Sequence, residues 1–274
     1  LAVFTIDEGI ELRDAGIKTN IFIYAKFDPK RIEEASKYNL TLNISSFDDL
    51  KALKAHKGNT IKVHLKIDTG MTRLGVPLDQ AEAFLKEATQ INSIELEGLY
   101  SHFATADEGD LSYANSQLSK FNDVVEIAKK LEMSFDFIHC SNSGAILNFQ
   151  DSRFNMVRAG MLLYGAFPSD EVPQELPIKS VMTFTAPVVE IRDVKAGTPI
   201  SYGGVYATEK DTRIAVVQAG FADGVPRPWY VDGFVKFKDQ NFKITGRICM
   251  DQLMIDVGSV DIQHGDEVLI FGSN

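Results

Sequence analysis

The chain has 274 residues, a formal net charge of −10 at pH 7 and a hydrophobic fraction of 45%. Such an acidic surface excludes nucleic acid and anionic membranes as partners, because both select a basic surface. The apolar runs are far shorter than the roughly 20 residues of a membrane-spanning helix, and Cys140 and Cys249 form no spaced disulfide framework. We therefore expect a cytoplasmic protein with reduced thiols.

The first part of the chain alternates strand patterns with helix patterns, as repeated βα units do. Seven runs have strand patterns: 1–5, 20–26, 40–45, 61–68, 96–104, 135–141 and 156–165. The segments between them carry helix formers, and several begin with Asp, Ser or Pro, which are helix start signals. A closed parallel barrel has eight strands, so this pattern predicts a (β/α)8 TIM-type barrel whose first βα unit is missing from this chain.

After about residue 178 the pattern changes to runs rich in Val, Ile and Thr, separated by Gly, Pro and Asp. Residues 233–245 alternate on both sides of residues 239–241, which predicts a hairpin. The chain ends soon after an apolar strand pattern, so we expect this part to be truncated at its C-terminus. We predict a barrel domain over residues 1–178 and a mostly-β domain over residues 179–274.

Polar clusters stand where the barrel strands end, which is where such barrels carry their functional residues. They are KIDTGMTR (66–73), SHFATAD (101–107), HCSNSG (139–144) and VRAGMLLYG (157–165). If the first strand is missing, the last two clusters follow strands seven and eight, a frequent phosphate site. Taken alone, the SNSG stretch is better interpreted as an ordinary helix N-cap.

The run at residues 61–68 alternates apolar residues with His64, Lys66 and Asp68. This polar face needs an explanation, because a strand of a parallel sheet covered on both sides is nearly all apolar. For His64, a hydrogen-bonded core histidine is the preferred interpretation.

Taken together, these motifs resemble the alanine racemase family, pyridoxal 5'-phosphate (PLP) enzymes with an N-terminal barrel and a C-terminal β domain. The resemblance spans nearly the whole chain and is carried in the family's order by 66–75, 101–107, 139–145, 155–165, PISYGGVY (199–206), GFADGVPR (220–227) and GRICMDQ (246–252). It implies an isomerase without a metal. It further implies racemisation of a small amino acid, most simply L-alanine to D-alanine for peptidoglycan precursors, in a homodimer with shared active sites.

The resemblance implies a two-base mechanism, since a proton removed from one face of a planar carbanion must be returned to the other. One base in the family is a Schiff-base lysine on the first strand, which has no counterpart here; Lys26 matches the third strand and is not assigned that role. We therefore expect this exact chain to be inactive if nothing precedes Leu1. The other base matches Tyr202, which otherwise would be a tyrosine in a turn at a domain edge.

Arg158 matches the arginine that faces the pyridine nitrogen of PLP, and His102 matches the histidine hydrogen-bonded to that arginine. A guanidinium keeps its protons, so it would leave the ring nitrogen unprotonated. Judged from the residues alone, Arg158 would be a barrel ion-pair residue and His102 a core histidine.

The resemblance also implies phosphate contacts from Ser143 and from the backbone at Gly160 and Met161. Asn142 belongs to the same cofactor-binding motif. The family match favours cofactor binding over the N-cap interpretation for this stretch.

Arg73 matches an arginine near the phenolic oxygen of the cofactor and the substrate carboxylate. Met250 matches a partner-subunit residue whose backbone meets that carboxylate. Lys66 and Arg73 would share a confined site, and two unpaired cations there are costly. We hypothesise that Lys66 carries a carbamate that orients Arg73, as in many members of the family.

Phe221 stands where the family usually has a tyrosine, so a hydroxyl of the substrate entrance is absent. Three alternatives remain open: a broader racemase acting on serine or lysine, a non-catalytic PLP carrier on the same barrel, and a non-functional fragment. The SYG and ICMDQ motifs count against the carrier, because such a protein resembles the barrel alone.

Overall fold

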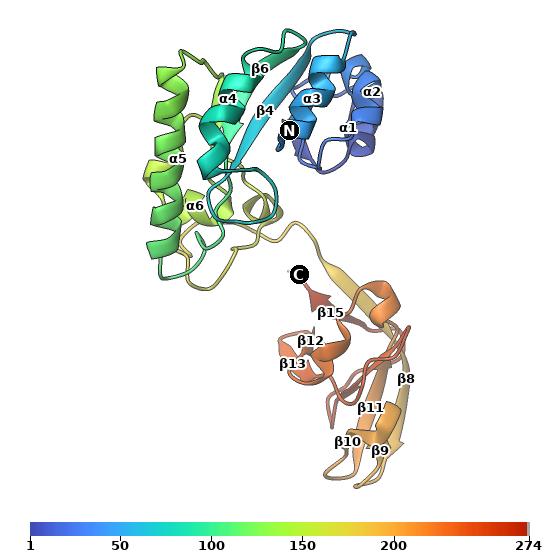
Figure 1. The fold of residues 1–274 in the computed structure, drawn as a ribbon. Helices are drawn as coiled ribbons and strands as arrows, with labels where there is room; N and C mark the ends of the chain where they lie inside the picture. Colours follow the sequence, from blue (N-terminus) through green and yellow to red (C-terminus); the bar gives the residue numbers. More distant parts are fainter. Residues whose placement is uncertain (273–274) are drawn as a thin grey trace. The chain divides into compact units, whose positions relative to one another are not determined.

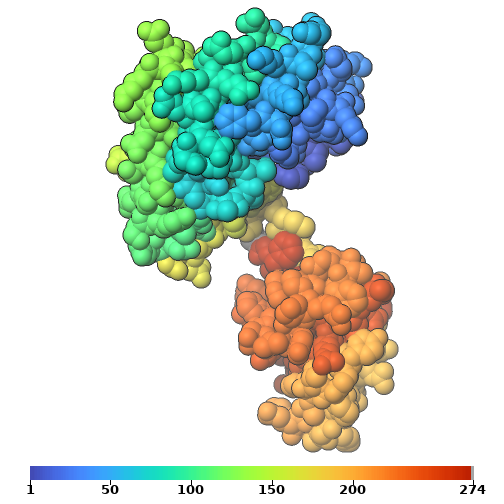
Figure 2. All heavy atoms as spheres, viewed as in Figure 1, coloured from blue at the N-terminus to red at the C-terminus, as the bar shows by residue number. Residues whose placement is uncertain are grey.

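The computed structural model describes residues 1–272, which form two compact units. The first is Leu1–Pro177 and the second begins at Ile178 (Figure 1). Each unit is closely packed in the space-filling view (Figure 2) and has its own hydrophobic core.

The first unit is built on a parallel sheet. Its strands are β1 (Ala2–Val3), β2 (Phe22–Ile23), β3 (Thr41–Ile44), β4 (Ile61–Asp68), β6 (Ile94–Tyr100) and β7 (Phe137–His139), in that spatial order, and the short β5 (Val76–Pro77) pairs only with β4. A parallel sheet whose strands follow chain order, each joined to the next through a helical segment, is the architecture of a TIM-type barrel. The predicted fold class is therefore confirmed.

Helices connect these strands. They are α1 (Ile6–Asp14), α2 (Ile32–Lys37), α3 (Phe47–Ala55), α4 (Ala81–Ala88), α5 (Ser112–Lys130) and α6 (Ser143–Asn148), with the 3₁₀ turns η1 (Pro29–Arg31), η2 (Leu78–Gln80), η3 (Gln150–Ser152) and η4 (Met161–Tyr164). The start signals act as expected: Thr5 and Glu8 form a capping box at α1, and Ser46 caps α3. Helices α3, α4 and α5 contact one another in turn (Figure 1).

The alternation along β4 separates two environments. Val63, Leu65 and Ile67 belong to the apolar core that the helices also fill. His64 and Lys66 point to the opposite face of the strand, and both are buried, at 2% and 3% exposure. The interior of the curled sheet is thus lined by polar side chains, which the unit must satisfy internally.

The prediction of a seventh strand at residues 156–165 is wrong. This segment begins extended, and Arg158 N–H donates to Ser141 O at 3.0 Å, as one rung of a ladder would. The backbone then leaves the extended conformation at Gly160 (φ −110°, ψ −90°) and continues as η4. One rung is too little pairing for a strand, and the apolar run instead forms a short 3₁₀ turn.

The second unit is an antiparallel sheet. Its strand order is β13 (Gln240–Lys243), β12 (Phe234–Phe237), β15 (Glu267–Phe271), β8 (Phe184–Val194), β11 (Thr212–Val217) and β14 (Leu253–Asp256), with a separate pair of β9 (Pro199–Ile200) and β10 (Tyr206–Ala207). The only helical elements among its described residues are 3₁₀ turns: η5 (Tyr202–Gly204), η6 (Phe221–Asp223) and η7 (Arg227–Tyr230). This agrees with the predicted mostly-β character.

The predicted hairpin is present as β12 and β13. Phe237 pairs with Gln240, so the turn is Lys238-Asp239, one residue earlier than the sequence suggested. Lys238 adopts φ 53°, a left-handed conformation that two-residue hairpin turns require.

Both cysteines are free. Cys140 is buried and its Sγ–H donates to Ser152 O at 3.3 Å. Cys249 is partly exposed, with its Sγ 3.6 Å from Ser201 Oγ. No helix within residues 1–272 is long and apolar enough to cross a membrane.

Candidate functional site

Two of the predicted site cations meet on one aromatic ring. The Tyr100 side chain, at the end of β6, is fully buried, and its ring lies 5.3 Å from Lys66 Nζ and 5.5 Å from Arg158 Cζ. Both contacts are within cation–π range. Arg73, in the loop after β4, is exposed, so the expectation that it shares a confined site with Lys66 is wrong for this residue. Its charge nevertheless lowers the pKa of Lys66 and of His102.

Arg158 is held by groups at the ends of β6 and β7. Its Nη2 donates to Ser101 O at 2.8 Å and to Cys140 O at 2.9 Å, and it lies 3.2 Å from His102 Nδ1. Its Nη1 contacts His139 Nδ1. Burial, followed by the charges of Arg158 and its cationic neighbours, lowers the pKa of His102 to about 3, so this ring is neutral and accepts from the guanidinium.

Lys66 is a buried cation that makes no ion pair with a carboxylate in the described part of the chain, although the charge of Asp68 favours its protonated form. Burial and then the charges of Arg73 and Arg158 lower its pKa to about 8. Asp68, the nearest candidate partner, instead caps the following loop: its Oδ1 accepts the backbone N–H groups of Gly70, Met71 and Thr72 at 2.9–3.1 Å. Lys66 and Asp68, on the polar face of β4, therefore form no ion pair with each other.

The motif after β7 meets the segment before η4. Asn142 caps α6, its Oδ1 accepting from Ala145 N–H at 3.0 Å, so the N-cap interpretation holds for this residue. Ser143 Oγ accepts from Gly160 N–H at 3.0 Å. A Cβ at Gly160 would meet only Ser143 Oγ, at 3.8 Å, so the backbone here is open to an approaching group. Met161 is exposed beside it.

The two predicted site residues of the second unit are both exposed. Tyr202 has 67% and Met250 57% of its surface accessible. Tyr202 follows Ser201, whose φ of 62° and ψ of −172° lie in a region that only glycine normally occupies. Ser201 Oγ donates to Arg247 O, which anchors this turn to the segment that carries Met250.

Sequence reasoning missed a buried chain of side chains behind Arg158. His139 Nε2 lies 2.9 Å from His64 Nδ1, and His64 Nε2 lies 3.3 Å from Glu97 Oε2. Glu97 was not singled out, although Gly98 beside it, inside a strand pattern, was a signal of close approach.

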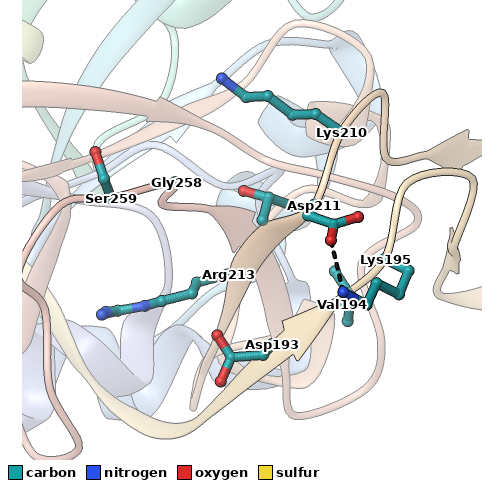
Figure 3. A pocket seen from close by; sticks show the side chains of 9 residues that line it. Asp193, Val194, Lys195, Lys210, Asp211, Arg213, Gly258 and Ser259 are labelled. Atoms are coloured by element: carbon teal, nitrogen blue, oxygen red, sulfur yellow. Dashed lines mark hydrogen bonds and ion pairs between the residues drawn. The ribbon is translucent and has the colours of Figure 1, made fainter.

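A surface pocket of the second unit lies apart from these residues. It has a volume of about 440 Å³ and is lined by charged side chains, with the exposed ion pair Lys195–Asp211 at 2.7 Å (Figure 3). None of the predicted site residues lines it. Exposed ion pairs are weak and common, so this pocket gives no sign of chemistry.

Comparisons with known proteins agree over the whole chain. The family profile described as alanine racemase, N-terminal domain, matches residues 1–168, and that of alanine racemase, C-terminal domain, matches residues 181–274. An alanine racemase of Desulforamulus reducens is 40% identical over 278 residues, covering 99% of this chain and 75% of its own.

Solved structures give the same result. Alanine racemase of Clostridium difficile 630 matches with a TM-score of 0.91 and 35% identity, over 100% of this chain and 73% of its own. Alanine racemase of Bacillus anthracis with bound L-Ala-P matches with a TM-score of 0.90 and 34% identity, over 100% and 72%. On its profiles, its relatives and its fold, the chain belongs to the alanine racemase family of isomerases.

Proposed function

We propose that this chain racemises a small amino acid with PLP, most simply L-alanine and D-alanine, and so supplies D-alanine for peptidoglycan precursors. The observation that carries this is the meeting of Lys66 and Arg158 on the ring of Tyr100, with His102 3.2 Å from Arg158. Ser143 and Gly160, which contact each other, follow the neighbouring strand end. The alanine racemase relatives support the reaction, and the relative with bound L-Ala-P supports a site that accepts an alanine-like ligand.

The donor set fits an anionic, phosphate-bearing cofactor. Buried Lys66 and half-buried Arg158 make no ion pair with a carboxylate within residues 1–272, and exposed Arg73 adds a third positive charge, so the site is electropositive and suits an anion. Within residues 1–272, Tyr24 Oη is buried and has no hydrogen-bond partner. Burial raises the pKa of this hydroxyl, and the charges of Arg158 and Arg73 oppose that rise. Ser143 Oγ adds a hydroxyl, and hydroxyl and cationic donors suit phosphate.

In this proposal the cofactor lies between these groups. Ser143, with the backbone at Gly160 and Met161, would hold its phosphate, Asn142 shapes that loop, and Arg158 would donate to its ring nitrogen. PLP, when bound, supplies an electron-withdrawing group that takes up the charge left when the α-proton of the amino acid is removed.

Arg158 and His102 would determine which protons are available near the pyridine ring of the cofactor. The guanidinium keeps its protons, and His102, with its lowered pKa, is neutral. Neither can therefore give a proton to the cofactor readily, which restrains charge delocalisation into the ring and limits side reactions.

Lys66 suits the carbamate hypothesis. With its pKa lowered to about 8, a fraction of its amine is neutral near physiological pH, and only the neutral amine adds to CO₂. Lys66 first loses one proton to give the neutral amine; addition to CO₂ then forms the N–C bond and releases a second proton. The two steps together convert the ammonium cation into a carbamate anion. That anion would accept hydrogen bonds from Arg73 and so orient it toward the substrate carboxylate.

Tyr202 would be the base on one face of the substrate. Its exposure, and that of Met250, suits residues that complete the site of a second subunit, so we propose a homodimer with shared sites. The opposite base would be the lysine that the family carries on its first strand.

The test is made on the full-length protein with PLP added. The appearance of the D-enantiomer from L-alanine, followed by chiral chromatography, should accompany a cofactor absorbance band. Serine and lysine are tested in parallel, since Phe221 alters the entrance. Cofactor binding without turnover of any of the three would favour the non-catalytic carrier.

A further inference from the structure

A continuous line of four side chains crosses the interior of the first unit. Arg158 Nη1 contacts His139 Nδ1, His139 Nε2 lies 2.9 Å from His64 Nδ1, and His64 Nε2 lies 3.3 Å from Glu97 Oε2. His64, Glu97 and His139 are buried to 3% exposure or less. The last contact falls outside strict hydrogen-bond geometry and is a close approach of ring N–H to carboxylate.

The hydrogen-bonding groups at the two ends of this line determine which nitrogen carries the proton in His139 and in His64. Arginine has only N–H donors, so His139 Nδ1 must accept and the proton of this ring must be on Nε2. His64 Nδ1 then accepts from His139, and its own proton is also on Nε2, facing Glu97. A neutral imidazole has one donor and one acceptor, so each step determines the next.

The hydrogen-bond partners of Glu97 likewise determine its protonation state. Glu97 Oε2 accepts from Thr41 Oγ1 at 2.8 Å, and Glu97 Oε1 accepts from Lys62 Nζ at 3.1 Å and from Asn20 Nδ2 at 3.3 Å. These donors and His64 require an ionised carboxylate. In agreement, the pKa of Glu97 is lowered to about 2, first by His64, and burial lowers the pKa of both His64 and His139, which keeps the rings neutral.

Packing holds the rings in this line. Gly98 is paired with His64 across β4 and β6, and a Cβ there would lie 2.5 Å from His64 Cγ. Phe22 stacks on His64 with centroids 4.4 Å apart, and Tyr100 stacks on His139 at 4.8 Å. Glycine opposite His64 thus provides the space that the ring occupies.

We propose that Glu97 and His64 are positioning residues for Arg158: the carboxylate sets the tautomer of His64, which sets that of His139, which then offers Arg158 an acceptor. The opposite polarity would point the Nδ1–H of His139 at a guanidinium N–H and push Arg158 away. The role of Arg158 toward PLP rests on the proposed function, but the polarity of the chain does not.

Glu97→Gln is the decisive variant. Its amide NH₂ must face either Lys62 and Asn20 or His64 and Thr41, and Lys62 cannot accept a hydrogen bond. The amide should therefore turn its NH₂ toward His64, whose proton then moves to Nδ1 and meets His139. Glu95→Gln is the matched control, since Glu95 is an exposed carboxylate on the same strand, 3.7 Å from Lys62 Nζ.

The readout is the tautomer of each ring, from long-range ¹H–¹⁵N correlation spectra of the full-length protein with ¹⁵N-labelled histidine. We expect Nε2–H on His64 and His139 in the wild type and in Glu95→Gln, and Nδ1–H on His64 in Glu97→Gln. The absorbance band of bound PLP should shift and kcat/KM should fall by about 10-fold or more, as when outer partners of a site are lost.

Nδ1–H on either ring of the wild type, or no change in Glu97→Gln, would overturn the proposal. If Glu97→Gln does not fold, the wild-type spectrum and Thr41→Val decide it, because removing that hydroxyl leaves the carboxylate and should leave both tautomers unchanged. Suppose both tautomers are as expected, but the protein neither binds PLP nor racemises an amino acid. The proposed polarity of the line from Glu97 to Arg158 would then be supported, and the proposed function would be wrong.

Discussion

The two units bury different kinds of side chain. Within the described residues, the interior of the first unit holds His64, Lys66, Glu97 and His139, together with ten uncharged or paired polar groups, whereas the second unit buries only the polar side chains of three threonines. The second unit has an ordinary apolar core and carries its candidate catalytic residue, Tyr202, on an exposed turn.

This difference shows two ways of preparing a site. In the first unit, buried polar side chains around Glu97 orient one another through hydrogen bonds and close contacts, so the order of the site comes from its own interior. In the second, the candidate side chain of Tyr202 is exposed and follows the strained backbone of Ser201. A residue prepared in this way gains its chemistry only against another surface, which is why the homodimer proposal matters for Tyr202.

The largest effect is expected from Tyr202→Phe. Loss of a general base typically costs about 10²–10⁴-fold in the step it serves. In ²H₂O, exchange of the α-proton should fall strongly for one alanine enantiomer and much less for the other, as measured by ¹H NMR on each enantiomer separately.

Tyr206→Phe is the control for that experiment, because Tyr206 lies four residues away and its Oη is engaged with Asp256 at 3.3 Å. It should keep both exchange rates. Small and equal losses for the two enantiomers in Tyr202→Phe would remove Tyr202 from the mechanism.

The buried carboxylate should make the first unit sensitive to acid. The folded pKa of Glu97, about 2, is below its ordinary value of 4.5. Its contribution to stability is therefore complete above pH 4.5 and is lost as pH falls from about 4.5 to about 2.

Urea unfolding followed down the pH scale checks this. Glu97→Gln should be less stable at neutral pH and should lose less stability on acidification than the wild type. Parallel pH curves for the two proteins would show that Glu97 does not carry this acid sensitivity.

Gly98→Ala should destabilise the first unit by about 1–3 kcal/mol, the usual cost of overpacking a core. The added methyl would meet the His64 ring. Urea unfolding of the single variant, and of Gly98→Ala in a His64→Ala background, gives the coupling between the two positions. The cost should shrink once the ring is gone, and an unchanged cost would place the strain elsewhere.

The smallest effect is expected at Ser201. Backbone strain of this kind costs about 1–3 kcal/mol, and the hydrogen bond from its Oγ contributes about 1 kcal/mol. Ser201→Gly relieves the first and loses the second, so it should change stability little. Ser201→Ala keeps the strain and should be the less stable of the two in thermal unfolding. The reverse order would mean that the turn is unstrained.

Much of the fold followed from periodicity. The alternation of His64 and Lys66 with Val63 and Leu65 indicated a strand with one polar face, and the structure has that strand as β4. The prediction of a strand at residues 156–165 was wrong because an apolar run fits a strand or a short 3₁₀ turn equally well. Only the pairing partners decide between them.

The site was predictable in part. Family motifs pointed to Arg158 and His102, which the structure brings within 3.2 Å. The contacts from His139 to His64 and from His64 to Glu97 could not be predicted from the sequence, because they join residues 75 and 33 positions apart. They link β4 to β7, two strands away, and β4 to its neighbour β6, and tertiary register alone aligns them.

The contrast between the two thiols offers a practical tool. Burial raises the pKa of Cys140 to about 12, so its reactive thiolate is scarce at neutral pH, and its hydrogen bond to Ser152 O holds it inside. Cys249, partly exposed beside the Ser201 turn, is left as the preferred target of a maleimide dye. Within these 274 residues, Cys249 therefore offers an accessible labelling position one residue from Met250, from which fluorescence would test the proposed assembly of two subunits.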